Sequence, residues 1–273
     1  MEKQKDTNPE TYYQKVAAHF DEDAKMFEQR YQENDVLQKI RKDFRRHTEK
    51  FKFSHALEIG SGPGIDLMYF AGKYPDRQFR GIDVSPEMVR ISNENIKKNH
   101  LENVLAKTGS VEDIPGLFPG EKFDMIYVYF GGLNTVYDLK AVVRQLYEVA
   151  EPGAVFVFTS VNRYYLMDFV YKSMKLKFGE ATARFRNRWK GYSPGRDLPS
   201  KVYSASQIKK TFRPEFKFID QRGYSIFYPP WFGAKALHNI PLLSTGLWLT
   251  DKFFQKTPLW NKGEYSLYIM KRN

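Results

Sequence analysis

The sequence predicts an α/β protein in which a parallel sheet is covered by helices on both faces. Between residues 55 and 162, short apolar runs alternate with segments of helical period. Each apolar run is consistent with a strand buried on both faces, which is typical of a parallel sheet. The length of 273 residues, 42% of them hydrophobic, suits one such domain with a small elaboration.

The first 50 residues predict helices that precede the sheet. Apolar positions recur at helical spacing from Tyr12 to Phe20, and the pattern continues from Phe27 to Phe44. We expect residues 1–50 to form a helical cap.

The central segment, residues 51–162, predicts five strands with helices between them. One helix has clear start signals, because Ser85 is a suitable N-cap and Pro86 suits the first helical position. Glu151-Pro-Gly153 is expected to end the last helix. The expected strands are Ala56–Ile59, Phe79–Asp83, Asn103–Thr108, Phe123–Tyr129 and Ala154–Val161, and the expected helices are Ile65–Tyr74, Pro86–Asn99 and Leu139–Ala150.

The alternation of strand and helix stops after residue 162. Residues 163–205 are aromatic and basic, and we interpret them as an insertion that forms a lid. Residues 206–273 should complete the sheet, with strands at Phe216–Phe227 and Tyr265–Lys271. The stretch between these strands, which includes Tyr228-Pro-Pro-Trp231, has the composition of a loop.

Positive charge is concentrated in the last part of the chain. The net charge is +11, and residues 163–222 alone hold 15 basic and 5 acidic side chains. Such a one-sided field favours an anionic partner, which would be nucleic acid, an anionic membrane or an acidic substrate. The alternative is a solvated surface that keeps the protein in solution.

The absence of cysteine excludes several classes of function. The chain has no disulfide framework, no thiolate metal site and no cysteine nucleophile. Its five histidines show no ligand spacing, so we expect no metal site. The polar N-terminus and the lack of a long apolar segment predict a cytoplasmic protein.

The most informative segment is Glu58-Ile-Gly-Ser-Gly-Pro-Gly64, where the first strand meets the first helix. Its glycines allow a tight turn and a close backbone approach, and the helix N-terminus offers N–H groups to a ligand. The spacing is not that of a dinucleotide site, because Ile65 stands where the third glycine is required. Asp83, at the end of the second strand, can accept hydrogen bonds from both hydroxyls of a ribose.

Five motifs follow one another: Leu57-Glu-Ile-Gly-Ser-Gly-Pro-Gly64, Gly81-Ile-Asp-Val-Ser-Pro-Glu-Met88, Gly109-Ser-Val-Glu-Asp-Ile-Pro115, Phe123-Asp-Met-Ile-Tyr127 and Glu151-Pro-Gly153. In this order they resemble the class I S-adenosylmethionine (SAM)-dependent methyltransferases of the quinone-biosynthesis type. The resemblance covers roughly residues 50–162. It implies a Rossmann-like sheet of seven strands in the order 3-2-1-4-5-7-6, whose last strand is antiparallel. It also implies SAM as the cofactor and S-adenosylhomocysteine as its product.

By this resemblance, the residues around the glycine loop bind the cofactor. Glu58 should lie near the methionine amine, Asp83 should bind the ribose, and the backbone N–H of Val111 should contact the adenine. Ser110 stands where the family often has an aspartate, so Glu112 or Asp113 is expected to contribute there. The full expected set is Glu58, Gly60, Ser61, Gly62, Asp83, Val84, Met88, Ser110, Val111, Glu112 and Tyr129.

Methyl transfer from a sulfonium depends mainly on alignment and desolvation. A general base is needed only for a weakly acidic acceptor such as a hydroxyl. The carboxyl ends of the strands, where ligands bind in open α/β sheets, favour the residues that follow the fourth and fifth strands. The candidates for a catalytic role are His19, Tyr129 and Asn134, and Tyr13, Asn162 and Arg163 are further candidates for the general base.

The kind of acceptor is only partly restricted. C5-methylation of pyrimidines needs a cysteine, which the chain lacks. Enzymes that methylate exocyclic amines of bases or glutamine amides share an Asp/Asn-Pro-Pro-aromatic motif, and Tyr129-Phe-Gly-Gly-Leu-Asn134 stands in its place. The apolar Tyr164–Tyr171 and the basic Lys172–Lys190 suit a lid over a small hydrophobic, lipid-like or anionic acceptor, with contact to an anionic membrane. O-, N- and C-methylation all stay open. The alternatives are an RNA methyltransferase that uses the basic residues 163–222, and a non-catalytic SAM-binding protein.

Overall fold

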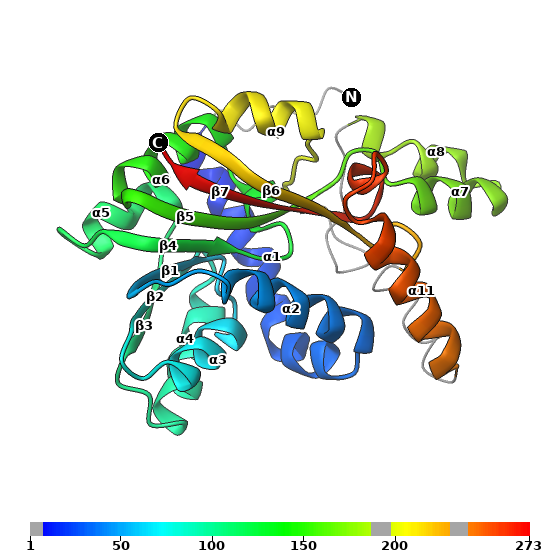
Figure 1. Ribbon diagram of the computed structural model, residues 1–273. Helices are drawn as coiled ribbons and strands as arrows, with labels where there is room; N and C mark the ends of the chain where they lie inside the picture. The colour runs from blue at the N-terminus through cyan, green and yellow to red at the C-terminus, as the bar shows by residue number, and fades with distance from the viewer. Residues whose placement is uncertain (1–7, 187–197, 230–239) are drawn as a thin grey trace.

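The computed structural model describes residues 8–186, 198–229 and 240–273, and a seven-stranded sheet runs through its centre (Figure 1). The strand order is β3-β2-β1-β4-β5-β7-β6. Strands β1 to β5 are parallel, and β7 is antiparallel to both of its neighbours. The predicted fold class, strand order and antiparallel last strand are therefore confirmed. The strands are β1 His55–Ile59, β2 Gln78–Asp83, β3 Val104–Thr108, β4 Phe123–Val128, β5 Ala150–Val161, β6 Phe216–Tyr224 and β7 Tyr265–Arg272.

Helices cover both faces of this sheet, and two separate apolar clusters lie beneath them (Figure 1). Alternate residues of a strand point to opposite faces, so Ala56 joins one cluster and Leu57 the other. The first cluster includes side chains of α1 to α4, and the second includes side chains of α5, α6 and α9. The helices are α1 Pro9–Gln32, α2 Asp35–Thr48, α3 Ile65–Lys73, α4 Pro86–Lys98, α5 Ile114–Leu117, α6 Leu139–Val149, α7 Leu166–Met174, α8 Phe178–Ala181, α9 Ala205–Phe212 and α11 Pro241–Phe254.

Local signals in the sequence explain where the central helices begin. Helix α4 starts at Pro86, and the Ser85 hydroxyl accepts a hydrogen bond of 3.1 Å from the backbone N–H of Met88. Gly64, with a φ of 82°, precedes α3, and a side chain there would collide with Ser92. The glycine loop is thereby positioned between β1 and α3.

Two local expectations are wrong. Strand β5 begins at Ala150 rather than at Ala154, so Glu151-Pro-Gly153, which follows the end of α6, lies within the strand as an irregularity, with Gly153 at a φ of 76°. The segment expected to be a loop between the last two strands contains helix α11. Pro241 in its first turn is the start signal that could have revealed it.

The segments expected as cap and lid hold helices of their own. Residues 1–50 contain α1 and α2, and residues 163–205 contain α7, α8 and the start of α9. Residues 187–197 of the expected lid, and Pro230 and Trp231 of the expected loop, lie outside the described residues. The cap and lid functions themselves stay predictions.

Candidate active site

The glycine loop is tied by its backbone to the end of the neighbouring strand β2. The N–H groups of Gly60 and Ser61 donate to the carbonyl of Ile82 at 2.8 and 3.0 Å. The N–H of Gly62 donates to the Asp83 carboxylate at 2.8 Å. The structure therefore brings together the loop and the acidic residue that the sequence places 19 positions after it.

Asp83 is held in one orientation by two backbone donors. Its second carboxylate oxygen accepts from the N–H of Ser85 at 2.9 Å. Burial raises the pKa of Asp83, while these backbone hydrogen bonds act in the opposite direction. Each carboxylate oxygen has two lone pairs, so both keep an acceptor position for a further hydroxyl donor.

Glu58 is a buried carboxyl group beside this loop. Its side chain is 3% exposed, and Tyr127 donates a hydrogen bond of 3.2 Å to it. Burial and the nearby negative charge of Asp66 raise the pKa of Glu58 well above its usual value. A cationic group placed next to Glu58 would favour its carboxylate form.

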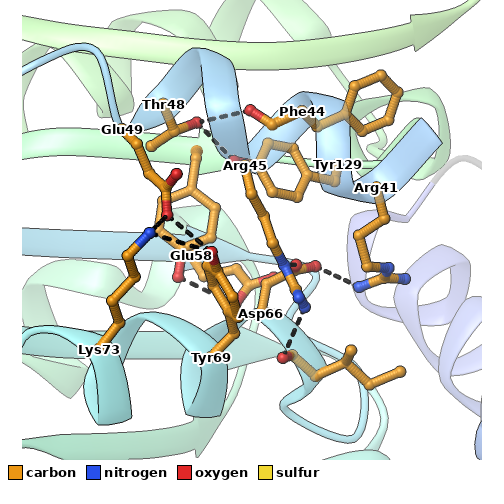
Figure 2. A network of polar contacts seen from close by, with 12 residues as sticks. Arg41, Phe44, Arg45, Thr48, Glu49, Glu58, Asp66, Tyr69, Lys73 and Tyr129 are labelled. Atoms are coloured by element: carbon orange, nitrogen blue, oxygen red, sulfur yellow. Dashed lines mark hydrogen bonds and ion pairs between the residues drawn. The ribbon is translucent and has the colours of Figure 1, made fainter. Parts of the chain in front are cut away.

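An ion-pair network joins the helix after the loop to α2 (Figure 2). Asp66, 1% exposed, pairs with Arg41 and with the Nε atom of Arg45, the latter at 2.5 Å. Arg45 also donates to the carbonyl of Ile65 at 2.9 Å. The guanidinium of Arg45 lies 4.0 Å from the centre of the Tyr69 ring. These pairs hold α2 over the start of α3, next to Glu58.

Sequence reasoning missed this network. Arg41 and Arg45 are separated by one helical turn, and Asp66 lies in the first turn of α3 directly after the glycines. This spacing indicates that α2 has a positively charged face, and it is the signal that could have pointed to the network. Their partner is 21 or more residues away in the chain, so only the fold identifies it.

Tyr129 lies under α2 at the end of β4. Its hydroxyl is 2.5 Å from the hydroxyl of Thr48, and its side chain is 6% exposed (Figure 2). Burial raises the pKa of Tyr129 well above its usual value, and the charge of Asp66 acts in the same direction. The phenol therefore stays protonated and can serve as a donor.

Asn134 and Asn162 use their amides to join backbone segments. The Asn134 amide donates to the carbonyl of Lys201 at 2.7 Å and accepts from the N–H of Val161 at 2.9 Å. The Asn162 amide donates to the carbonyl of Gly263 at 2.9 Å and accepts from Ser266. Both side chains thus fix the loops that follow β4 and β5.

Helix α1 connects to the ends of two further strands. Tyr13 donates to the Glu112 carboxylate at 2.9 Å, after β3, and Asp21 accepts from Ser85 at 2.5 Å, after β2. His19, the third catalytic candidate, is a buried residue of the same helix whose ring meets Phe20 edge-on at 5.3 Å. The structure thus brings α1 to the carboxyl ends of β2 and β3.

The expected adenine residues gather after β2 and β3. Met88 and Val111 are buried, with 1% and 2% of their surface exposed, and Val84 packs against the first apolar cluster. Ser110 donates to Asp113 through its backbone N–H and its hydroxyl, both at 2.8 Å. The Asp113 carboxylate is therefore engaged in closing this turn.

Two observations fit the presence of a small ligand at the loop. The Ser61 hydroxyl is buried and has no hydrogen-bond partner in the described part of the chain, which ordinarily costs free energy. A Cβ atom added to Gly62 would meet nothing within 4 Å, so its backbone faces open space. A ligand with hydroxyl and amine groups could engage Ser61, Asp83 and Glu58.

Two relatives in the comparison with known proteins match most of the chain. An uncharacterized protein of Methanocaldococcus jannaschii is 26% identical over 266 residues, which are 96% of this chain and 89% of that protein. The demethylmenaquinone methyltransferase of Geobacillus kaustophilus is 24% identical over 252 residues, 87% of this chain and 98% of that protein.

Solved structures share the fold. An S-adenosylmethionine-dependent methyltransferase from Clostridium acetobutylicum has a TM-score of 0.54 and 14% identity, and the match covers 84% of this chain and 89% of that one. Coclaurine N-methyltransferase, solved with N-methylheliamine and SAH, has a TM-score of 0.53 and 13% identity over 84% of this chain and 71% of that one. The family model of the methyltransferase domain matches residues 50–215. Since this match spans more than half of the chain, the chain belongs to the methyltransferase domain family, as the order of its motifs predicts.

Proposed function

We propose that this protein binds SAM at the glycine loop and transfers its methyl group to a small hydrophobic or lipid-like acceptor. The observation that carries the proposal is the convergence of Glu58, the unpartnered Ser61 hydroxyl and Asp83 at one loop, in a chain of the methyltransferase family. When bound, SAM supplies a methyl group on a sulfonium, which is an electrophile.

The residues near the loop match the parts of SAM by chemistry. A cationic amine next to Glu58 lowers its raised pKa and favours the carboxylate form. Glu58 is therefore a suitable partner for the methionine amine of SAM. Asp83 accepts hydrogen bonds from the ribose hydroxyls in an orientation that Gly62 and Ser85 already maintain. Val84, Met88 and the N–H of Val111 line the adenine side, where Ser110 and Glu112 are the neighbouring polar groups.

The other side chains orient the acceptor and exclude water. Because burial keeps Tyr129 protonated, it donates hydrogen bonds and positions groups rather than removing a proton. His19 is the candidate base if the acceptor is a hydroxyl. Asn134 acts indirectly, because its amide is used to fix the loop after β4.

A hydrophobic acceptor is supported by the exposed apolar side chains after β5 and by one relative. Tyr164, Leu166 and Tyr171 are each more than 40% exposed. The Geobacillus relative is named for demethylmenaquinone, which supports a hydrophobic acceptor here as well. We place the protein in the cytoplasm, in contact with an anionic membrane, and regard nucleic acid as the less favoured partner.

The cofactor proposal is tested with Asp83→Ala. Removing the ribose acceptor is expected to weaken SAM binding by about 1–3 kcal/mol, which is roughly 5- to 150-fold. Isothermal titration calorimetry with SAM measures this loss, and Asp76→Ala, at an exposed position before β2, is the matched control. Unchanged SAM affinity in a folded Asp83→Ala protein would contradict the proposed site.

The acceptor is tested by incubating the protein with methyl-labelled SAM and a cell extract. Label in the lipid or small-molecule fraction supports the proposed function, whereas label in RNA supports the alternative and contradicts it. Intact SAM binding with no label in any fraction would instead indicate the non-catalytic SAM-binding protein.

A further inference from the structure

Helix α11 exposes an apolar face opposite to the one with which it packs. Its inner side carries Trp248, which contacts Tyr228, and Asp251, which is fully buried. Its outer side carries Leu242, Leu249 and Phe253, which are 89%, 62% and 75% exposed. No charged residue occurs between positions 240 and 250. A surface helix ordinarily presents polar residues to water. An exposed apolar face such as this one is typical of a surface that binds a partner.

The segment of α7 and α8 has the same character. Met174, Leu176 and Phe178 are 80%, 78% and 60% exposed. Lys175 and Lys177 are exposed between them. Apolar side chains therefore alternate with positive charges along this segment.

Both segments emerge from the same end of the sheet. Helix α7 follows the end of β5, and Arg184 links its Asp168 to Glu264, which precedes β7. Asp251 of α11 accepts hydrogen bonds from the N–H groups of Phe227 and Tyr228, just after β6, at 2.7 and 3.0 Å. Figure 1 shows α7, α8 and α11 extending beyond the sheet on one side of the molecule. The carboxyl ends of β5 and β6 lie at the same end as the glycine loop that follows β1.

The charges indicate what this surface contacts. Asp168 and Asp251, the acidic residues of α7 and α11, are buried, with 3% and 0% of their surface exposed. Glu180 of α8 is exposed and forms an ion pair with Lys177. Residues 163–222, which include α7 and α8, hold 15 basic and 5 acidic side chains. Exposed aliphatic groups bordered by lysines match the interface of an anionic bilayer, where apolar groups enter the acyl boundary and lysines stay with the headgroups. RNA would use the lysines but gain nothing from Leu242, Leu249 and Met174.

We infer that α7, α8 and α11 together form a docking surface for an anionic lipid bilayer. None of the described helices is long and apolar enough to cross a membrane. Docking here would bring the glycine loop's end of the sheet to the bilayer, so that the acceptor can be taken from the lipid phase. That last step rests on the proposed function, whereas docking itself is measured without methyl transfer.

The test is flotation of the full chain with two kinds of vesicle. One contains phosphatidylcholine alone, and the other contains equal parts of phosphatidylcholine and phosphatidylglycerol. We expect the protein to float with the anionic vesicles and to be released as salt rises. Leu242→Glu and Phe253→Glu should each weaken binding by about tenfold or more, because each removes an inserted apolar group. The matched control is Met26→Glu, at a side chain of α1 that is 51% exposed, and it should float like the unmodified protein.

Several results would overturn the inference. The unmodified protein could stay at the bottom with both vesicles, or all three variants could float equally well. Light scattering could also show that Leu242→Glu and Phe253→Glu convert a dimer into monomers while the unmodified protein ignores vesicles, which would make the surface a subunit interface. Calorimetry with SAM on the same variants separates the two proposals, since docking variants should bind SAM as the unmodified protein does.

Discussion

Apolar side chains are buried on one side of the molecule and exposed on the other. Along β1 to β4, residues such as Leu57, Phe79 and Ile126 are at most 1% exposed, because helices cover both faces of the sheet. Beyond β5, α7 and α11 leave Met174 and Leu242 at least 80% exposed. The first side is a core that specifies the fold, whereas the second exposes large apolar side chains to solvent.

Charge differs in the same way between the two sides. Beside the glycine loop, the buried carboxylate of Asp66 is paired with Arg41 and Arg45. Past β5, exposed lysines accompany the apolar helices. A buried charge must be paired within the protein, whereas an exposed one is available to a partner. This contrast determines where substitutions should be costly.

The largest effect is expected from Asp66→Asn. It removes the negative charge that compensates two arginines, of which Arg41 is 7% exposed, and leaves them without their partner. We expect the free energy of unfolding to fall by about 3–5 kcal/mol, measured by urea denaturation. Asp76→Asn, at an exposed position, is the control and should stay within about 0.5 kcal/mol. A loss at Asp66 no larger than that of the control would show that the network does not stabilise the fold.

The next effect compares one substitution on the two sides. Leu67 of α3 is fully buried, so Leu67→Ala should lower the free energy of unfolding by about 2–5 kcal/mol. Leu249→Ala, on the outer face of α11, should change it by less than about 0.5 kcal/mol. The two variants are compared in the same denaturation series. Similar losses would mean that Leu249 is buried in solution and that α11 is not a free surface.

The third effect is a pH dependence that belongs to Glu58. Because the folded protein raises its pKa, Glu58 contributes stability below the unfolded pKa of about 4.3, and this contribution is lost as pH rises through the raised value. Glu58→Gln cannot ionise, so its melting temperature relative to the unmodified protein should improve between pH 5 and pH 8. Thermal unfolding at the two pH values measures this change. If the difference in melting temperature between the two proteins were the same at both pH values, Glu58 would not be the group with the raised pKa.

Glu58 also predicts the direction in which SAM affinity changes with pH. A cationic amine lowers the pKa of Glu58, so SAM binding should release a proton and strengthen as pH rises through the raised value. Glu58→Gln should bind SAM more weakly and lose that dependence. Calorimetry in two buffers with different ionisation enthalpies detects the released proton, and its persistence in the variant would contradict the assignment.

Local signals explain why much of the fold could be predicted. Ser85 and Pro86 mark the start of α4, and β1 to β4 are short strands in which most apolar side chains are buried. Helix α11 could not be recognised by periodicity, because apolar residues lie on its inner and its outer face. A period becomes visible only where one face is polar.

The candidate site was predictable where strand order alone brings residues together. Adjacent parallel strands end at the same edge of the sheet, so the glycine loop after β1 had to lie beside Asp83 after β2. The ion pair of Asp66 with Arg41 depends on where α2 packs on the sheet. The hydrogen bond from Asn134 to the carbonyl of Lys201 depends on where residue 201 lies relative to the end of β4. No spacing within the chain encodes those placements.

The sequence by itself determined the position of the glycine loop and, through the order of its short motifs, the resemblance to the family, because motifs depend on residues close together in the chain. The strand order was what that resemblance implied. Only the tertiary structure decided that Arg41 and Arg45 neutralise Asp66 beside Glu58, and that α11 presents Leu242 and Phe253 outward. The physical reason is that burial and electrostatic pairing depend on distances between segments far apart in the chain, which are established only when the helices pack on the sheet.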